Sequence, residues 1–325
     1  GIKQIINGPF TFAPDGNPLV GPVKGLPGFW CACGVMAGFS QGGGVGLALA
    51  NWMTEGDPGF DVWGMDVARF GDWATMAYTN AKVRENYSRR FSIQFPNEEL
   101  PAARNLKTTP LHDRWVAMGA QMGVSWGVET PLWFAPEGVS DVFSWRRSID
   151  FGHVAGEAQA VRAGVGIGEV SQFSKFTIEG ADAEPFLDRM LACRLPAPGR
   201  MALAPMLKAD GKLIGDLSVA RIDETTFFLA GSGQAEDFYL RWWLGHVGAD
   251  EDVEITAHGL GICGLTIAGP KARDVLAACV REDVSHAAFR FMAFREMDVG
   301  MAPCMVGRVS FTGDLGYEIW MAPEH

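Results

Sequence analysis

Hydrophobic and polar positions along the first 140 residues predict short strands, turns and a few helices. Residues 1–35 combine β-like apolar runs with proline and glycine breakers, among them the stretch 14–18. A glycine-rich stretch, 38–46, precedes an apolar run, and we expect it to form a turn that opens a helix. The other elements predicted in this part are helices over 71–90 and near 111–119, and strands around 126–134.

The pattern changes near residue 150, where helical and β-like segments begin to alternate regularly. Helices are predicted over 153–163, 183–191 and 235–244. Strands are predicted over 165–170 and 173–178, with a hairpin formed by 213–220 and 226–230. This succession predicts an α+β domain that is separate from the first part, with the boundary near 140–150.

Two acidic residues stand inside apolar β-like runs. If 213–219 is a strand, Ile214, Asp216 and Ser218 share one of its faces. An acid preceded by glycine in such a run is a candidate for a perturbed pKa, although an exposed acid on the wet face of an edge strand fits the pattern equally well.

The second acid, Glu318, lies in the run from Gly307 to Met321. Two β-like runs flank a turn over 313–316, and the second run carries Glu318 between two large apolar residues. Burying a carboxylate there is costly unless it is paired. The pattern therefore favours a ligand that offers hydrogen-bond donors, although an exposed acid on a wet face is again an alternative.

Charge and composition exclude several classes of partner. The chain has 325 residues and a formal net charge of −11, which argues against nucleic acid or an anionic membrane as the main partner. No apolar run reaches the roughly 20 residues that span a bilayer. The six cysteines are scattered and indicate a reducing, cytosol-like compartment, and no metal site is predicted.

The glycines at 42–44 admit two interpretations. If they precede a helix, their N–H groups are exposed at its positive end and suit a phosphate or another electron-rich ligand edge. The stretch is neither a GxGxxG motif after a first strand nor a P-loop. A tight turn with close helix packing explains the glycines slightly better when the residues are considered alone.

The stretch 7–44 resembles the closing part of the flavin domain in the dimethylglycine and sarcosine dehydrogenase family. Its shared features are Asn7–Pro9, Gly28–Trp30 and the glycine run. The resemblance implies that the cofactor is FAD and that its isoalloxazine ring lies against these residues: Ser40, Gln41, Gly42, Gly43 and Gly44. Residues 110–115 and 127–134 resemble the bridging segment of the same family.

From about residue 150 onward, the chain resembles the folate-binding domain of the glycine-cleavage T-protein family. The motifs are 161–171, 178–187, 211–217 and 307–319. The resemblance implies that Asp216 is the catalytic carboxylate beside the reacting nitrogen of tetrahydrofolate. It also implies that the folate is held by Glu318, which accepts hydrogen bonds from the pterin, and by Arg308 and Phe311.

This chain departs from the T-protein pattern at three places. Phe311 stands where the family often has tyrosine, Asp314 replaces a frequent glutamate, and 231–233 lacks a common asparagine. These departures affect the finer contacts to folate.

Together the resemblances imply three parts. They are the tail of an FAD-dependent oxidoreductase domain (1–70), a bridging segment (71–145) and an aminomethyltransferase-like folate-binding domain (146–325), incomplete at its C-terminus. We expect a piece of an FAD-dependent N-methyl amine dehydrogenase that passes a one-carbon unit to tetrahydrofolate. We expect this piece to be inactive on its own.

The substrate is expected to be a small N-methyl amine, and the electron acceptor stays open. The expected location is the cytoplasm, or the mitochondrial matrix in a eukaryote. Two alternatives remain, a T-protein-like aminomethyltransferase or demethylase and a non-catalytic regulatory relative. The first gives residues 1–140 no role, and the presence of Asp216 and Glu318 counts against the second.

Overall fold

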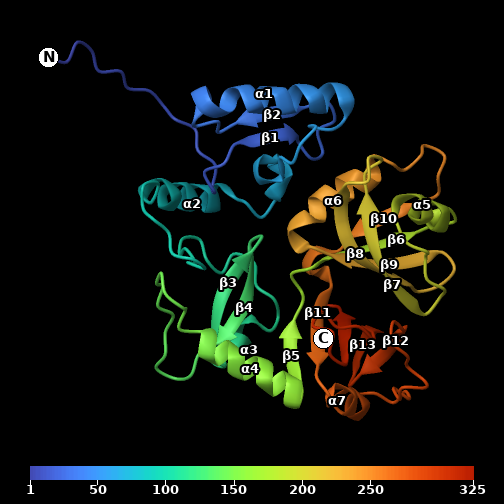
Figure 1. Ribbon diagram of the computed structural model, residues 1–325. Coiled ribbons are helices and arrows are strands. Elements are labelled where there is room, and N and C mark those ends of the chain that lie inside the picture. Colours follow the sequence, from blue (N-terminus) through green and yellow to red (C-terminus); the bar gives the residue numbers. More distant parts are fainter. The chain divides into compact units, whose positions relative to one another are not determined.

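A computed structural model describes all 325 residues and divides them into two compact units, Gly1–Leu106 and Lys107–His325 (Figure 1). Helices and strands both occur throughout, so the predicted mixed α+β class is confirmed. None of the helices combines the length and the apolar content needed to cross a membrane.

In the first unit, one long helix covers a small hairpin. Strands β1 (Leu19–Pro22) and β2 (Trp30–Cys33) pair antiparallel, and helix α1 (Gly38–Glu55) packs on them through Trp52 (Figure 1). The other elements of this unit are η1 (Trp63–Met65), η2 (Val67–Arg69) and α2 (Met76–Ser88).

The predicted glycine turn before this helix is wrong. Helix α1 already begins at Gly38, so Gly42, Gly43 and Gly44 lie inside it. Their N–H groups therefore donate within the helix, and only the first turn leaves N–H groups without intrahelical partners. The apolar run that follows was sufficient to predict the helix, but the glycines obscured its start.

The second unit opens with a helix, a hairpin and a further helix. These are α3 (His112–Ala117), β3 (Ala120–Ser125), β4 (Val128–Phe134) and α4 (Phe151–Ala163). The predicted helices and the tryptophan-rich strands are confirmed, except that Trp126 lies in the turn between β3 and β4, with a φ of 51°.

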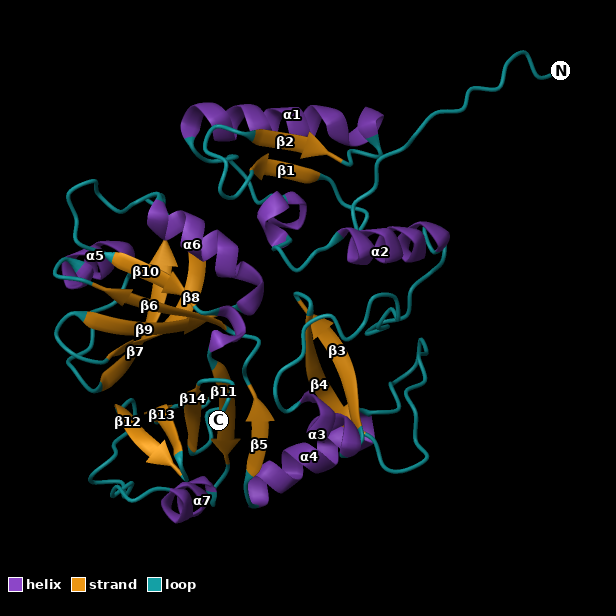
Figure 2. Cartoon of the chain, turned by 180° about the vertical axis from the view of Figure 1, so that it is seen from behind, coloured by secondary structure: helices purple, strands orange, loops and turns teal.

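Two five-stranded antiparallel sheets form the rest of the second unit (Figure 2). The first sheet has the order β10-β6-β9-β8-β7 and the second the order β12-β13-β14-β11-β5. The strands are β5 (Gly166–Glu169), β6 (Ser174–Glu179), β7 (Arg200–Leu207), β8 (Leu213–Arg221), β9 (Thr226–Gly231), β10 (Glu254–Ala257), β11 (Cys263–Ala268), β12 (Phe294–Val299), β13 (Ala302–Gly307) and β14 (Gly316–Met321). The helices are α5 (Ala183–Met190), η3 (Gly233–Ala235), α6 (Glu236–Leu244), η4 (Gly259–Gly261) and α7 (Ala272–Cys279).

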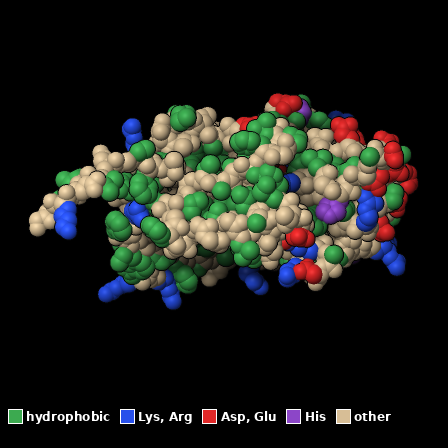
Figure 3. Space-filling model, turned by 90° about the horizontal axis from the view of Figure 1, so that it is seen from above, with side chains coloured by type: hydrophobic (Ala, Val, Ile, Leu, Met, Phe, Trp, Pro, Cys, Tyr) green, Lys and Arg blue, Asp and Glu red, His purple; other side chains and the backbone are tan.

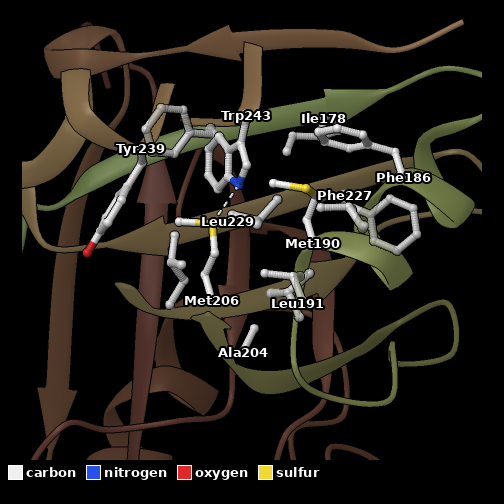
Figure 4. Close-up of a cluster of buried hydrophobic side chains, with 14 of the residues drawn as sticks. Ile178, Phe186, Met190, Leu191, Ala204, Met206, Phe227, Leu229, Tyr239 and Trp243 are labelled. Atoms are coloured by element: carbon white, nitrogen blue, oxygen red, sulfur yellow. Dashed lines mark hydrogen bonds between the residues drawn. The ribbon is translucent and has the colours of Figure 1, made fainter. Parts of the chain in front are cut away.

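Each sheet has its own hydrophobic core on one face. The core of the first sheet lies against α5 and α6 and centres on Trp243, whose indole N–H donates to the Met206 sulfur at 3.0 Å (Figure 4). The core of the second sheet lies against α7. A third cluster joins the opposite faces of the two sheets, where the rings of Phe228 and Trp320 lie 5.7 Å apart.

Two local predictions about strands need correction. The hairpin β8–β9 is confirmed, but the β7–β8 register shifts at Ile214, which turns this side chain into the first core with Leu217 and away from the face of Asp216. In the last motif, β13 ends at Gly307, so residues 308–315 form a loop where a first β-run was expected.

Candidate functional site

Asp216 lies in a central strand with its side chain exposed. Strand β8 pairs with β7 on one side and β9 on the other, so the alternative of an edge strand is wrong. Alternation along β8 places Asp216, Ser218 and Ala220 on one face. Because Ala220 belongs to the cluster shared with Trp320, this is the face that looks toward the second sheet.

Gly215 lets an aromatic ring approach the strand beside Asp216. A Cβ at Gly215 would come within 2.5 Å of the Tyr239 ring, so only glycine fits there. The Asp216 N–H hydrogen-bonds to the Tyr239 hydroxyl, and burial followed by the Asp216 charge raises the pKa of Tyr239. In Figure 4 this hydroxyl points away from the other labelled side chains of the core.

Tyr239 was not predicted as a site residue. The signal that points to it is the glycine directly before Asp216, which indicates a close approach by some other group. Nothing in the sequence says which group that is, because Tyr239 comes from helix α6.

Glu318 is buried in the middle of the second sheet. Strand β14 lies between β13 and β11, and Glu318 stands opposite Gly307 and Thr266. Its carboxylate has no hydrogen-bond or ion-pair partner, and burial raises its pKa to about 7. Glu318 is thus a buried acid and not an exposed one on a wet face, and the protein supplies no hydrogen-bond donor to it.

Arg308 lies in the loop before β14 and is also buried. Its guanidinium donates to the Phe289 carbonyl at 2.7 Å and approaches the His286 Nδ1 at 3.1 Å, while its Nε is buried without a partner. It lines a pocket of about 250 Å³ with Ser310 and other residues of its loop. Phe311, by contrast, is almost fully exposed, so the fold does not bring it into this pocket.

The two carboxylates come from facing sheets. Along β14, Glu318 shares its face with Trp320, which packs in the cluster between the sheets. Asp216 and Glu318 therefore both belong to the faces that the two sheets turn toward each other. The structure thus places the two predicted acids on the facing sides of the two sheets, although they lie far apart in the sequence.

The residues expected near a flavin lie on the first two turns of α1. Ser40 donates its hydroxyl hydrogen to the Ala37 carbonyl at 3.1 Å, and a Cβ added at Gly42, Gly43 or Gly44 would meet nothing within 4 Å. This side of the helix is open, and Phe39 in its first turn is fully exposed. Figure 3, seen from above, shows hydrophobic side chains at the surface of the molecule.

Comparison with known proteins is consistent with both parts of this description. The GCVT N-terminal domain matches residues 111–325, which is most of the chain. The chain belongs to the GCVT N-terminal domain family. A second match, to the FAD dependent oxidoreductase central domain, covers residues 55–109.

The chain is also similar to dimethylglycine and sarcosine dehydrogenases, as the sequence motifs indicated. It is 34% identical to the mitochondrial dimethylglycine dehydrogenase of Homo sapiens over 98% of its own length and 37% of that protein. It is 28% identical to the human mitochondrial sarcosine dehydrogenase over 98% of its length and 40% of that protein. The chain therefore spans little more than a third of the length of these relatives.

Among solved structures, the chain is similar in fold to a T-protein. The glycine cleavage system aminomethyltransferase T of Bartonella henselae superposes with a TM-score of 0.55 at 22% identity. The match covers 67% of this chain and 54% of the other. At this identity the similarity establishes the fold and nothing further.

Proposed function

We propose that this chain is part of an FAD-dependent N-methyl amine dehydrogenase of the dimethylglycine and sarcosine type that passes the one-carbon unit to tetrahydrofolate. The observation that carries the proposal is the Glu318 carboxylate, which is buried without a partner. It lies on the same face of β14 as Trp320, and Trp320 packs in the cluster between the two sheets. The relatives named above and the match to an FAD oxidoreductase domain support the flavin half.

The residues present fit a folate ligand. A pterin offers amino and ring N–H donors, and a carboxylate with its pKa raised to about 7 by burial gains most from such donors. Tetrahydrofolate, when bound, supplies the amine nitrogen that takes up the one-carbon unit. Glu318 would hold and orient the pterin, and Asp216, which is exposed, would stabilise positive charge near that nitrogen.

In this chain, helix α1 is the element that would contact the flavin. The open first turns of α1 would lie against the flavin, whose chemistry when bound is to accept the hydride of the amine. The positive end of the helix dipole, at Gly38 and Phe39, favours negative charge nearby. The proposed substrate is a small N-methyl amine. The proposed location is the cytoplasm or the mitochondrial matrix, and the names of the two relatives call them mitochondrial.

A stand-alone T-protein-like aminomethyltransferase explains less of the chain. The fold of the second unit agrees with it. It gives no role to Gly1–Leu106, part of which matches an FAD oxidoreductase domain.

The test uses Asp216→Ala in the full-length parent protein. If the proposal is right, amine oxidation, measured as dye reduction, stays near the wild-type rate. Transfer to tetrahydrofolate falls by about 10² or more, since electrostatic groups at a reacting centre contribute on this scale. Formaldehyde is then released in place of methylenetetrahydrofolate. Unchanged transfer would remove Asp216 from the mechanism, and a wild-type protein that binds no tetrahydrofolate would remove the folate half of the proposal.

A further inference from the structure

Lys175 is a fully buried lysine on the face of the first sheet that looks toward the second. It lies in β6, whose neighbouring residues Phe176 and Ile178 point into the core on the opposite face. Its ammonium group donates to the Ser171 carbonyl at 2.6 Å. A buried ammonium is costly, so its presence in place of an apolar residue calls for a specific role.

Ser171 connects this lysine to the second sheet. Its hydroxyl donates to the Glu169 carboxylate at 2.9 Å and accepts the Gly264 N–H at 3.1 Å. Glu169 belongs to β5 and Gly264 to β11, which are neighbouring strands of the second sheet. The other oxygen of Glu169 accepts the indole N–H of Trp115 at 2.7 Å.

The register of the first sheet places Lys175 near the level of Asp216. Lys175 and Ser218 both stand opposite Ala230, one from each side. Asp216 follows on the same face of β8, two residues from Ser218. The lysine side chain runs toward Ser171, which lies beyond the N-terminal end of β6, and this is the end of the sheet where Asp216 lies.

We propose that Lys175 is a positioning residue of the folate site: through Ser171 it ties the sheet that carries Asp216 to the sheet that carries Glu318. This inference rests on the proposed function, because it assigns the tie a role in folate binding. Lys175 itself touches neither carboxylate. It acts by fixing the two sheets, and thereby the two acids, relative to each other.

Charged and titratable groups from several elements surround the ammonium. Glu236 of α6, Glu169 of β5 and the Cys263 thiol of β11 favour its charge, while Lys107 opposes it. Burial is the largest influence and lowers the pKa of Lys175 to about 8. The lysine in turn contributes, after burial, to the lowered pKa of His258.

The pKa shift gives the tie a distinctive pH signature. An unfolded lysine keeps its proton up to about pH 10.5, whereas folded Lys175 loses it near pH 8. Between these values the unfolded state binds more protons, so this group makes the free energy of unfolding rise with pH. The charge-assisted bond to Ser171 weakens over the same range, so folate affinity falls while stability rises. A purely structural lysine would not produce this opposition.

The experiment compares the full chain with Lys175→Met and, as a control, with Lys271→Met, which removes an exposed lysine. Tetrahydrofolate binding is measured by calorimetry between pH 6.5 and 9.5. We expect Lys175→Met to bind about tenfold to a hundredfold more weakly at pH 7, the range for loss of one charge-assisted bond. We expect it to lose the alkaline decline seen in wild type, and Lys271→Met to match wild type.

Hydrogen exchange at Gly264 provides a readout that needs no folate. Its N–H is held by the Ser171 hydroxyl, so Lys175→Met should accelerate its exchange at least about tenfold, while Lys271→Met should not. Equal folate affinity in wild type and Lys175→Met, or unchanged Gly264 exchange, overturns the inference. If wild type binds no folate, the folate half of the proposed function fails, and the exchange result alone then decides whether Lys175 ties the two sheets together.

Discussion

At the scale of single residues, two acids that look alike in sequence have different environments. Asp216 and Glu318 both stand in apolar β-like runs, and the sequence alone leaves each of them either buried or exposed. In the structure Asp216 is exposed, while Glu318 is buried with its pKa raised to about 7. The difference arises from what covers each strand, which is set by the arrangement of the two sheets and cannot be read from neighbouring residues.

The raised pKa of Glu318 makes a prediction about stability. Between pH 4.5 and about 7 the folded state holds a proton that the unfolded state has released, so the free energy of unfolding falls as pH rises through this window. The loss is on the order of 3 kcal/mol. We expect Glu318→Gln to lack this fall, as measured by urea unfolding at pH 5 and pH 8. Asp216→Asn, at an exposed site, should keep the wild-type dependence, and a Glu318→Gln profile parallel to wild type would contradict the assignment.

Folate binding should release the same proton from Glu318. If the pterin donates to an ionised Glu318, binding near pH 6 must release the proton that the free protein holds. Calorimetry in two buffers of different ionisation enthalpy should show up to about one proton released at pH 6 and close to none at pH 8.5. Glu318→Gln should release none and bind at least about tenfold more weakly, since it loses a charge-assisted acceptor. Binding without proton release at pH 6 would show that Glu318 does not receive the pterin.

At the scale of elements, periodicity predicted most helices and strands but missed places where one residue breaks the pattern. The register shift at Ile214 moves that side chain to the opposite face, and the loop over 308–315 replaces an expected strand. Both depend on long-range pairing, of β8 with β7 and of β13 with β14. The close approach of Tyr239 to Gly215 also needs the packing of α6, which no local pattern supplies.

The glycines of α1 give a prediction about helix stability. Gly43 and Gly44 lie inside the helix with open space around them, so alanine there fits without a clash. We expect each Gly→Ala change to stabilise the first unit by up to about 1 kcal/mol, because alanine loses less backbone entropy on folding. Gly21→Ala is the matched control. Gly21 has a φ of 117°, and a Cβ there would come within 2.8 Å of Trp52, so this change should destabilise the unit.

Two measurements test this prediction: thermal unfolding of the chain, and hydrogen exchange of the α1 amides. Loss of stability in Gly43→Ala or Gly44→Ala would mean that the side of the helix is not open. In the full-length parent the same two substitutions should instead weaken flavin binding, if the proposed contact with the ring is right, because an added methyl would occupy the space of the flavin.

At the scale of the whole molecule, the order of motifs predicted more than the local patterns did. Flavin-type residues come first and folate-type residues follow, and the two matched domain families lie in the same order along the chain. The structure separates the chain at Leu106 and Lys107. Residues 107–145, which the motifs group with a bridging segment, form part of the second compact unit, because β4 and α4 pack with each other and α4 leads into β5.

Two compact units imply that folate should stabilise only one of them. A ligand that binds the native state alone adds about 2.7 kcal/mol at a concentration of 100 Kd. Tetrahydrofolate should therefore slow exchange throughout Lys107–His325, where Asp216 and Glu318 lie, and leave Gly1–Leu106 unchanged. Hydrogen exchange with peptide resolution measures both units in one sample, and Glu318→Gln serves as the control in which protection of the second unit is largely lost. Equal protection of the first unit would show that the two units unfold together, and the folate-type residues would then not form an independently stabilised domain.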